Sequence, residues 1–270
     1  MAALDMMNDG NEWIVDIDLE KFFDTVNHDK LMTIIGRTIK NGDVISIVRK
    51  YLISGIMIDD EYEASIVGTP QGGNVTIVGN IMLNELDKEM VKRGLNFVRY
   101  ADDCNIMVGS EMSARRVMRK ITKFIEEKLG LKVNATKSKF DKPQGLKYLG
   151  FGFYYDSYTH QYKVKPHTKA VEKLKRRLKE LTCRSWGVST ATKVKKLNEL
   201  IRGWINYFKV GSMKTICREM DKRIRFRLRM CIWKQWKTPK NRAKKLIELG
   251  INRKYAWTTA YNGARIAHTC

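Results

Sequence analysis

The first 165 residues alternate between short apolar runs and amphipathic stretches. Short apolar or β-branched runs bounded by polar turns indicate strands, and apolar positions that recur every three or four residues indicate helices. The pattern predicts strands at 12–19, on both sides of Asp102, at 131–134 and as a pair within 146–165, and a strand followed by a Pro/Gly loop in 65–76. It predicts helices at 28–40, 43–53, 75–92 and 113–129. Asp43 is predicted to cap one helix and Gly130 to end another. This order predicts an α+β domain with a mostly antiparallel sheet.

After about His167 the pattern is helical throughout. Residues 192–211 place one apolar stripe at helical spacing, made of Val194, Leu197, Leu200, Ile201, Trp204, Ile205 and Phe208, and Gly211 ends that helix. A second helix is predicted at about 213–236, and a third at 238–250 with Thr238 as N-cap and Pro239 at the first helical position. The C-terminal part is therefore expected to be a small helical bundle.

Charge separates the same two parts. The net charge is +22, and residues 151–270 carry 30 Lys and Arg against 7 Asp and Glu, whereas residues 1–150 carry 21 against 22. A basic excess of this kind is typical of nucleic-acid binding, because neutralising phosphates releases counterions. The alternative is a solvated, lysine-rich surface that only keeps the protein soluble.

Other features exclude several classes of protein. No apolar run is long enough to span a bilayer, and the first residues lack a secretory signal, so we expect a cytoplasmic protein without membrane contact. The five cysteines are widely spaced, without a CxxC pair or a histidine at ligand spacing. Neither a disulfide framework nor a zinc site is expected.

Adjacent carboxylates, Asp102 and Asp103, stand between two predicted strands in the segment RYADDCNIMV. A second strand, EWIVDIDL, carries Asp16 and Asp18, and spacing does not choose between them because residues two apart face the same side. If these strands are neighbours, carboxylates from distant segments meet at one edge of the sheet. Such a group is suited to Mg²⁺, which prefers a few carboxylates plus waters and substrate phosphates. By itself an Asp-Asp pair is more often a simple turn.

Five motifs in order resemble those of a known family. DLEKFFD, GTPQGG, YADD, GLKVNATKSK and LKYLGFGF resemble the successive palm motifs of reverse transcriptases, in the form found in bacterial group II intron-encoded reverse transcriptase/maturases, and LNELIRGWINYF resembles their thumb and maturase region. The resemblance implies an α+β polymerase palm over 1–165 and an all-helical thumb/maturase domain over 166–270. It also implies RNA-directed DNA synthesis with two Mg²⁺ ions, Mn²⁺ being the alternative ion. The implied partners are group II intron RNA as template, a DNA primer and deoxynucleotides, and a homodimer is left open.

The resemblance assigns roles to single residues. Asp18 matches the first aspartate of the family's D-x-x-x-F-F-D pattern, so Asp18, Asp102 and Asp103 are implied as catalytic metal ligands. Leu149 and Gly150 match the hairpin that grips the primer. Residues implied to contact the nucleotide are Phe22 or Phe23 beside the ribose, Gln71 and Gly72 in the PQGG loop, and Lys137 near the phosphates. The alternatives are core aromatics, a plain turn and a solvated lysine.

The helix at 213–236 is a candidate RNA contact. Arg218, Arg225 and Arg229 are spaced to lie on one side of it and could follow a nucleic-acid backbone, while Trp204, Tyr207, Trp233 and Trp236 are candidates for base stacking or, more simply, for the core.

The chain departs from the family pattern at its ends. The first palm motif begins within the first twenty residues, so the fingers are expected to be largely missing, and the maturase region is expected to stop slightly short. Two other readings remain, the first supported by the C-terminal charge bias and the second by the missing fingers. One is an RNA-binding splicing cofactor without polymerase activity, and the other is an inactive truncated fragment.

Overall fold

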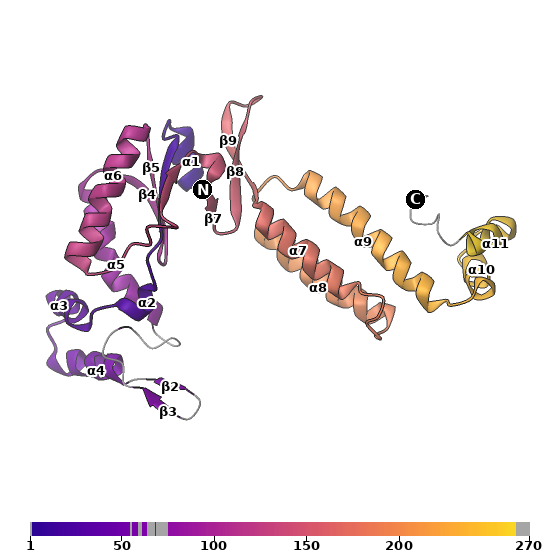
Figure 1. Ribbon diagram of the computed structural model, residues 1–270, viewed down its shortest axis with the longest axis horizontal. Coiled ribbons are helices and arrows are strands. Elements are labelled where there is room, and N and C mark those ends of the chain that lie inside the picture. Colours follow the sequence, from indigo (N-terminus) through magenta and orange to yellow (C-terminus); the bar gives the residue numbers. More distant parts are fainter. Residues whose placement is uncertain (1, 55, 59–60, 64–67, 69–74, 263–270) are drawn as a thin grey trace. The chain divides into compact units, whose positions relative to one another are not determined.

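A computed structural model describes residues 2–54, 56–58, 61–63, 68 and 75–262 (Figure 1). The chain forms two compact units. The first comprises Met1–Leu146 with Phe153–Tyr162, and the second comprises Lys147–Gly152 with Lys163–Cys270. Each unit is described by itself below.

A four-stranded sheet forms the centre of the first unit. Its strands are β1 (Trp13–Ile17), β4 (Asn96–Tyr100), β5 (Asp103–Val108) and β6 (Lys139–Asp141), in the order β4-β5-β1-β6. Every pairing is antiparallel, as predicted. The strands on both sides of the YADD motif are therefore β4 and β5, and β5 is hydrogen-bonded directly to β1.

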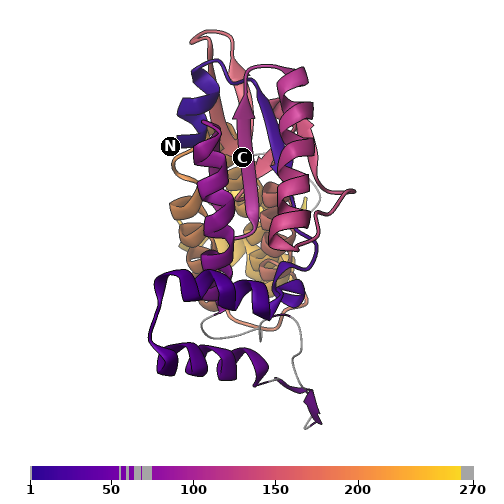
Figure 2. The same ribbon diagram turned by 90° about the vertical axis from the view of Figure 1, so that its left-hand side faces the viewer.

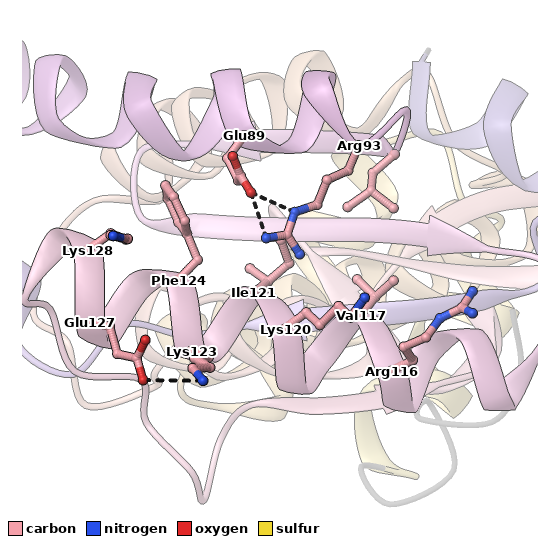
Figure 3. Close-up of a pocket in the computed structure, with 11 residues that line it drawn as sticks. Glu89, Arg93, Arg116, Val117, Lys120, Ile121, Lys123, Phe124, Glu127 and Lys128 are labelled. Carbon is pink, nitrogen blue, oxygen red and sulfur yellow. Dashed lines mark hydrogen bonds and ion pairs between the residues drawn. The ribbon is translucent and has the colours of Figure 1, made fainter.

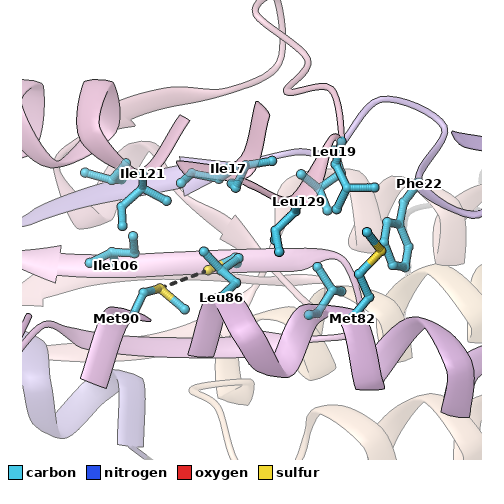
Figure 4. Close-up of a cluster of buried hydrophobic side chains, with 14 of the residues drawn as sticks. Ile17, Leu19, Phe22, Met82, Leu86, Met90, Ile106, Ile121 and Leu129 are labelled. Atoms are coloured by element: carbon cyan, nitrogen blue, oxygen red, sulfur yellow. Dashed lines mark hydrogen bonds between the residues drawn. The ribbon is translucent and has the colours of Figure 1, made fainter. Parts of the chain in front are cut away.

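Two helices cover one face of this sheet. Helix α5 (Val75–Lys92) contacts β4, and helix α6 (Glu111–Phe124) contacts β1, β5 and β6. Alternate residues of the two central strands, Val15 and Ile17 of β1 with Cys104 and Ile106 of β5, enter the core beneath these helices. Figure 4 shows this core, and Figure 2 shows α5 and α6 lying along the strands. Asp16, which lies between Val15 and Ile17, therefore faces the opposite side of the sheet.

The remaining elements of the first unit complete the chain between the strands. They are α1 (Ala2–Asn8), α2 (Phe22–Thr25), α3 (His28–Thr38), α4 (Gly42–Ile53), β2 (Ile56–Ile58), β3 (Glu61–Glu63), a π-helical turn η1 (Ile125–Leu129) and a 3-10 turn η2 (Pro143–Gly145).

Three local predictions can be compared with these elements. The cap of α4 is Asn41 and not Asp43, because the Asn41 side chain accepts hydrogen bonds from the backbone N–H groups of Asp43 and Val44. The strand predicted at 131–134 is wrong, since only Val133 forms an isolated bridge, to Leu19. Gly130 ends the α6–η1 helix with a φ of 67°, as predicted.

The chain also forms a three-stranded sheet. It consists of β7 (Lys147–Tyr148), β8 (Phe151–Asp156) and β9 (Gln161–Pro166), in that order. Leu149 and Gly150 form a two-residue turn between β7 and β8, with φ values of 49° and 80°. Left-handed conformations at both turn positions suit the twist of a tight hairpin.

The second unit is helical after β9. It contains α7 (Thr168–Leu181), α8 (Thr190–Phe208), α9 (Lys214–Gln235), α10 (Pro239–Glu248) and α11 (Arg253–Tyr261). Its core joins α7, α8 and α9 through Leu174, Leu178, Leu181, Leu197 and Met220. Thr238 caps α10 as predicted, accepting a hydrogen bond from the backbone N–H of Asn241. Among the described residues, no helix is long and apolar enough to cross a membrane.

Candidate active site

Three aspartates gather on the sheet face that α5 and α6 leave uncovered: Asp16 of β1, Asp18 directly after β1, and Asp103 of β5. In the antiparallel register, Asp16 lies opposite Asn105 and Ile17 lies opposite Cys104. Asp18 follows the last paired residue of β1, so continuation of the same register places it opposite Asp103. Because side chains alternate along a strand, Asp16, Asp18, Asp103 and Asn105 share one face.

The pKa of the Asp16 carboxyl reflects the charged groups that lie close to it. The pKa of the Asp16 carboxyl is raised to about 6, chiefly by burial and next by the negative charge of Asp103; Lys139 lowers it and Asp18 raises it by smaller amounts. Lys139 is the cross-strand neighbour of Asp16 on β6. Asp16 therefore lies among negative charges that Lys139 only partly offsets.

Asp18 is held firmly by its backbone. Its N–H donates to Ser138 Oγ at 3.0 Å, and its carbonyl accepts a hydrogen bond from the N–H of Asn134 at 2.9 Å. Its carboxylate oxygen Oδ2 is buried and has no hydrogen-bond partner among the described residues, although the ammonium of Lys137 lies 3.4 Å away as an ion pair. The predicted phosphate-contacting lysine thus stands beside the predicted metal ligand.

Asn105 is a member of this cluster that sequence analysis missed. The residue is fully buried, its Nδ2 donates to Asp103 Oδ1 at 3.4 Å, and its own Oδ1 has no hydrogen-bond partner in the described part of the chain. The available signal was its place two residues after Asp103 in an otherwise apolar strand.

The turn that carries the YADD motif is strained and braced. Ala101 has a φ of 55°, a left-handed conformation that costs a non-glycine residue free energy, and Asp102 is the other turn residue between β4 and β5. Arg99 donates to the carbonyl of Ala101 at 2.8 Å. The same guanidinium is anchored to helix α5, through two hydrogen bonds to Asp87 at 2.7 and 2.5 Å and one to Asn80 at 2.9 Å.

The fit of this site to a divalent cation can be tested on its donor set. In the described residues no three His, Cys, Asp or Glu side chains already converge as a complete metal-ligand set. Mg²⁺ needs only one or two protein carboxylates when waters and substrate phosphates supply the rest. A bound ion would complete the coordination of Asp18 Oδ2, which accepts no hydrogen bond from the described residues, and would relieve the repulsion between Asp16 and Asp103, so the residues fit the group.

Phe22 and Phe23 lie at different depths. Phe22 is buried in the core of the first unit, whereas Phe23 only packs against that core from a partly exposed position. Helix α5 can lie this close to the Phe22 ring because residue 79 is a glycine; a Cβ there would lie 2.8 Å from a carbon of the ring. Gln71 and Gly72 lie outside the described residues.

The Leu149–Gly150 turn is clamped within the second unit. Tyr207 of α8 donates its hydroxyl to the carbonyl of Leu149 at 2.8 Å, and the N–H of His167 donates to the carbonyl of Gly150 at 2.9 Å. The Tyr207 ring also stacks on Phe151 at a centroid distance of 5.7 Å. These contacts fix the predicted primer-gripping turn against α8.

Two family descriptions match most of the chain. Residues 4–153 match reverse transcriptase (RNA-dependent DNA polymerase), and residues 171–249 match the group II intron maturase-specific domain. The first match spans more than half of the sequence and contains the whole carboxylate cluster. The chain belongs to the reverse transcriptase family. Its second match makes it a member of the group II intron reverse transcriptase/maturases, as the sequence motifs predicted.

Individual relatives agree with this assignment. The chain is 27% identical over 200 residues to a putative COX1/OXI3 intron 2 protein of Saccharomyces cerevisiae, covering 52% of this chain and 23% of the relative. It is 33% identical over 91 residues to the group II intron-encoded protein LtrA of Lactococcus lactis, covering 33% of this chain and 15% of that protein. The chain therefore spans less than a quarter of the length of these relatives.

A solved structure supports the fold of this chain. Apo telomerase from Candida tropicalis matches with a TM-score of 0.50 at 12% identity, over 75% of this chain and 44% of that chain. At this identity the likeness concerns the fold alone. The α+β palm fold with a helical C-terminal region, predicted from the sequence, is confirmed.

The basic helix α9 of the maturase-specific region uses its arginines in different ways. Arg218 and Arg225 are exposed and Arg229 is partly exposed, and Arg225 forms an ion pair with Asp221 at 3.0 Å. Arg227 instead turns inward, where it donates to the hydroxyl of Thr182 and the carbonyl of Lys179. Trp204 packs against the helical core, which favours the core reading over base stacking for this residue.

Proposed function

We propose that this chain catalyses RNA-directed DNA synthesis by two-metal nucleotidyl transfer, and that its basic C-terminal part binds group II intron RNA and assists splicing. The observation that carries the first part is the pairing of β1 with β5, which brings Asp18 and Asp103 from distant segments to one edge of the sheet. The proposed substrates are an RNA template, a DNA primer and deoxynucleotides.

In this proposal Asp18, Asp102 and Asp103 hold Mg²⁺, or Mn²⁺ in its place. The bound ions would activate the primer 3′-hydroxyl for attack on the α-phosphate and stabilise the pyrophosphate that leaves. The protein's own contribution is to present the carboxylates on a rigid hairpin: Arg99 holds the turn, and Ser138 and Asn134 hold the backbone of Asp18.

Other residues would position the nucleotide and the primer. Phe23 is the better candidate for contact with the ribose, because the Phe22 ring is buried in the hydrophobic core. Lys137 carries a positive charge next to Asp18 and is proposed to meet the nucleotide phosphates, together with Gln71 and Gly72. Leu149 and Gly150 would support the primer end through the clamped turn.

A second candidate function is splicing assistance without polymerisation. It is favoured by the match of residues 171–249 to the maturase-specific domain and by the basic excess of residues 151–270, neither of which depends on the carboxylates. Arg218, Arg225 and Arg229 are the proposed RNA contacts.

Primer extension separates the two candidates. The purified chain is given an RNA template, an annealed DNA primer, Mg²⁺ and deoxynucleotides, beside Asp18→Ala, Asp102→Ala and the matched control Asp43→Ala, whose carboxylate is exposed on α4. We expect extension by the parent and by Asp43→Ala, and a loss of more than roughly 100-fold in the other two. Extension that persists without Asp18 and Asp102 contradicts the two-metal proposal. Absence of extension from every protein, with RNA binding retained, favours the splicing cofactor.

A further inference from the structure

The outer face of α6 is strongly basic. Its inward residues, Ala114, Val117 and Ile121, are buried in the core, so the helix is fixed with the opposite face in solvent. That exposed face carries Arg115, Arg116, Arg119, Lys120 and Lys123, five cations within nine residues. A helix needs only a narrow apolar stripe to pack, and nothing in the packing requires its outer face to be cationic.

Ion pairs with described residues account for two of these five charges. Arg115 pairs with Glu111 at 3.2 Å and Lys123 with Glu127 at 3.7 Å. Arg116, Arg119 and Lys120 have no ion pair with any described residue. We call these three residues the α6 surface. Figure 3 shows Arg116 and Lys120 on the helix, beside Arg93, whose charge is taken up by Glu89 of α5.

The α6 surface lines two hollows. One, of about 710 Å³, lies between α5 and α6 and is lined by Arg116 and Lys120 over an apolar floor that includes Val117 and Ile121 (Figure 3). The other, of about 580 Å³, lies at the start of α6 and is lined by Arg116 and Arg119. Arg116 belongs to both, so the two hollows adjoin along the helix.

This surface is separate from the carboxylate site. Helix α6 covers the sheet face that receives Val15 and Ile17, whereas Asp16 and Asp18 face the other side. It also differs in charge from its unit as a whole, since Met1–Leu146 with Phe153–Tyr162 carry 20 Lys and Arg against 23 Asp and Glu. Local concentration of cations in a unit without net positive charge points to an anionic partner.

We propose that the α6 surface binds the phosphate backbone of RNA, at a position distinct from the template and primer at the carboxylates. The inference rests on the proposed function, because a chain that folds or copies a large intron RNA must hold it outside the catalytic site. Arg116 and Lys120 are one helical turn apart, which presents cations at a repeat of about 6 Å along the groove. Arginine forks bind phosphate oxygens in pairs, so contact would be to the backbone and would carry little sequence preference.

A salt series tests this proposal directly. A fluorescently labelled structured RNA is titrated with the full chain from low to moderate KCl, beside the variant Arg116→Gln/Arg119→Gln/Lys120→Gln. Because each lost phosphate contact removes roughly 0.7 to 0.9 from the slope of log affinity against log salt, the slope should become shallower by about 2. The matched control, Lys40→Gln/Arg49→Gln/Lys50→Gln, removes the same charge from exposed positions around α4 and should leave the slope unchanged.

The outcomes separate this proposal from the preceding one. An unchanged slope in the α6 variant, or an equal change in both variants, overturns the α6 surface while leaving the proposed function untouched. All six substituted side chains are exposed and glutamine is a good helix former, so both variants should fold. Primer extension on a short template that cannot reach α6 should be the same for the parent and the α6 variant. A fall in that activity also contradicts a separate surface.

Discussion

At the scale of single residues, the candidate site depends on side chains that position the proposed metal ligands but are not proposed to bind metal or substrate themselves. Arg99 donates hydrogen bonds to the carbonyl of Ala101 in the strained turn and to Asp87 and Asn80. Asn105 is fully buried and donates a hydrogen bond to Asp103. The motif residues Asp18, Asp102 and Asp103 could be named from the sequence, but their supports could not. An arginine before a turn has no distinctive pattern, and its partner Asp87 becomes a neighbour only when α5 packs beside β4.

Removal of the Arg99 brace should impair metal binding before it impairs the fold. In Arg99→Leu the turn loses its anchor, and we expect the Mg²⁺ requirement to rise and synthesis to fall by roughly 10- to 100-fold, the range typical of residues that orient metal ligands. The measurement is primer extension as a function of Mg²⁺ concentration, with thermal melting in parallel.

The control for Arg99 is Arg37→Leu. Arg37 also forms an ion pair with α5, to Glu85 at 2.9 Å, but makes no contact with the turn. It should leave the Mg²⁺ dependence unchanged. A purely structural role for Arg99 would lower the melting temperature while the Mg²⁺ dependence stayed the same.

The cysteines should differ sharply in reactivity. A hydrogen bond with Ser185 lowers the pKa of the partly exposed Cys183 thiol, whereas burial raises that of Cys104 to about 12. Only the thiolate is nucleophilic, so near neutral pH iodoacetamide should modify Cys183 first, at a rate that rises with pH until the thiol is fully ionised. Peptide mass spectrometry reads each site. Equal labelling of Cys183 and Cys104 in the folded chain would contradict this order.

At the scale of helices and strands, hydrophobic periodicity predicted which elements exist better than it predicted which of their side chains face the core. Helix α5 has the predicted bounds, and α10 has the predicted cap, because both have clear local signals. On α8 the predicted stripe was partly wrong: Val194 and Ile205 are 39% and 37% exposed, while Lys193 is buried. The Lys193 ammonium donates to the carbonyl of Cys183 at 2.8 Å and lies 5.8 Å from the Trp186 ring centre. A lysine enters the core there because tertiary contacts satisfy it, which no sequence period reveals.

The helical core predicts a clear cost of truncation. Leu178 of α7 is fully buried among α7, α8 and α9, so Leu178→Ala should lower the free energy of unfolding of the second unit by about 2–5 kcal/mol. Urea unfolding followed by tryptophan fluorescence is suitable because Trp186 and Trp204 pack against the same core. Leu249→Ala, at a position that is 71% exposed, serves as the control and should change stability little. A similar loss in both variants would mean that Leu178 is not part of a close-packed core.

At the scale of the whole molecule, the charge asymmetry predicts how RNA is held. The basic excess of residues 151–270 should make RNA affinity fall steeply with salt, and Arg218→Gln/Arg225→Gln/Arg229→Gln should make that slope shallower by about 2. Arg227 is left in place because it braces Thr182. The α9 arginines and the α6 surface belong to different units and share no ion-pair partner among the described residues, so their effects should add when the two variants are combined. The same salt titration measures this sum. A combined slope change no larger than either single one would mean that the RNA occupies one surface at a time, and an additive change would mean that both hold it together.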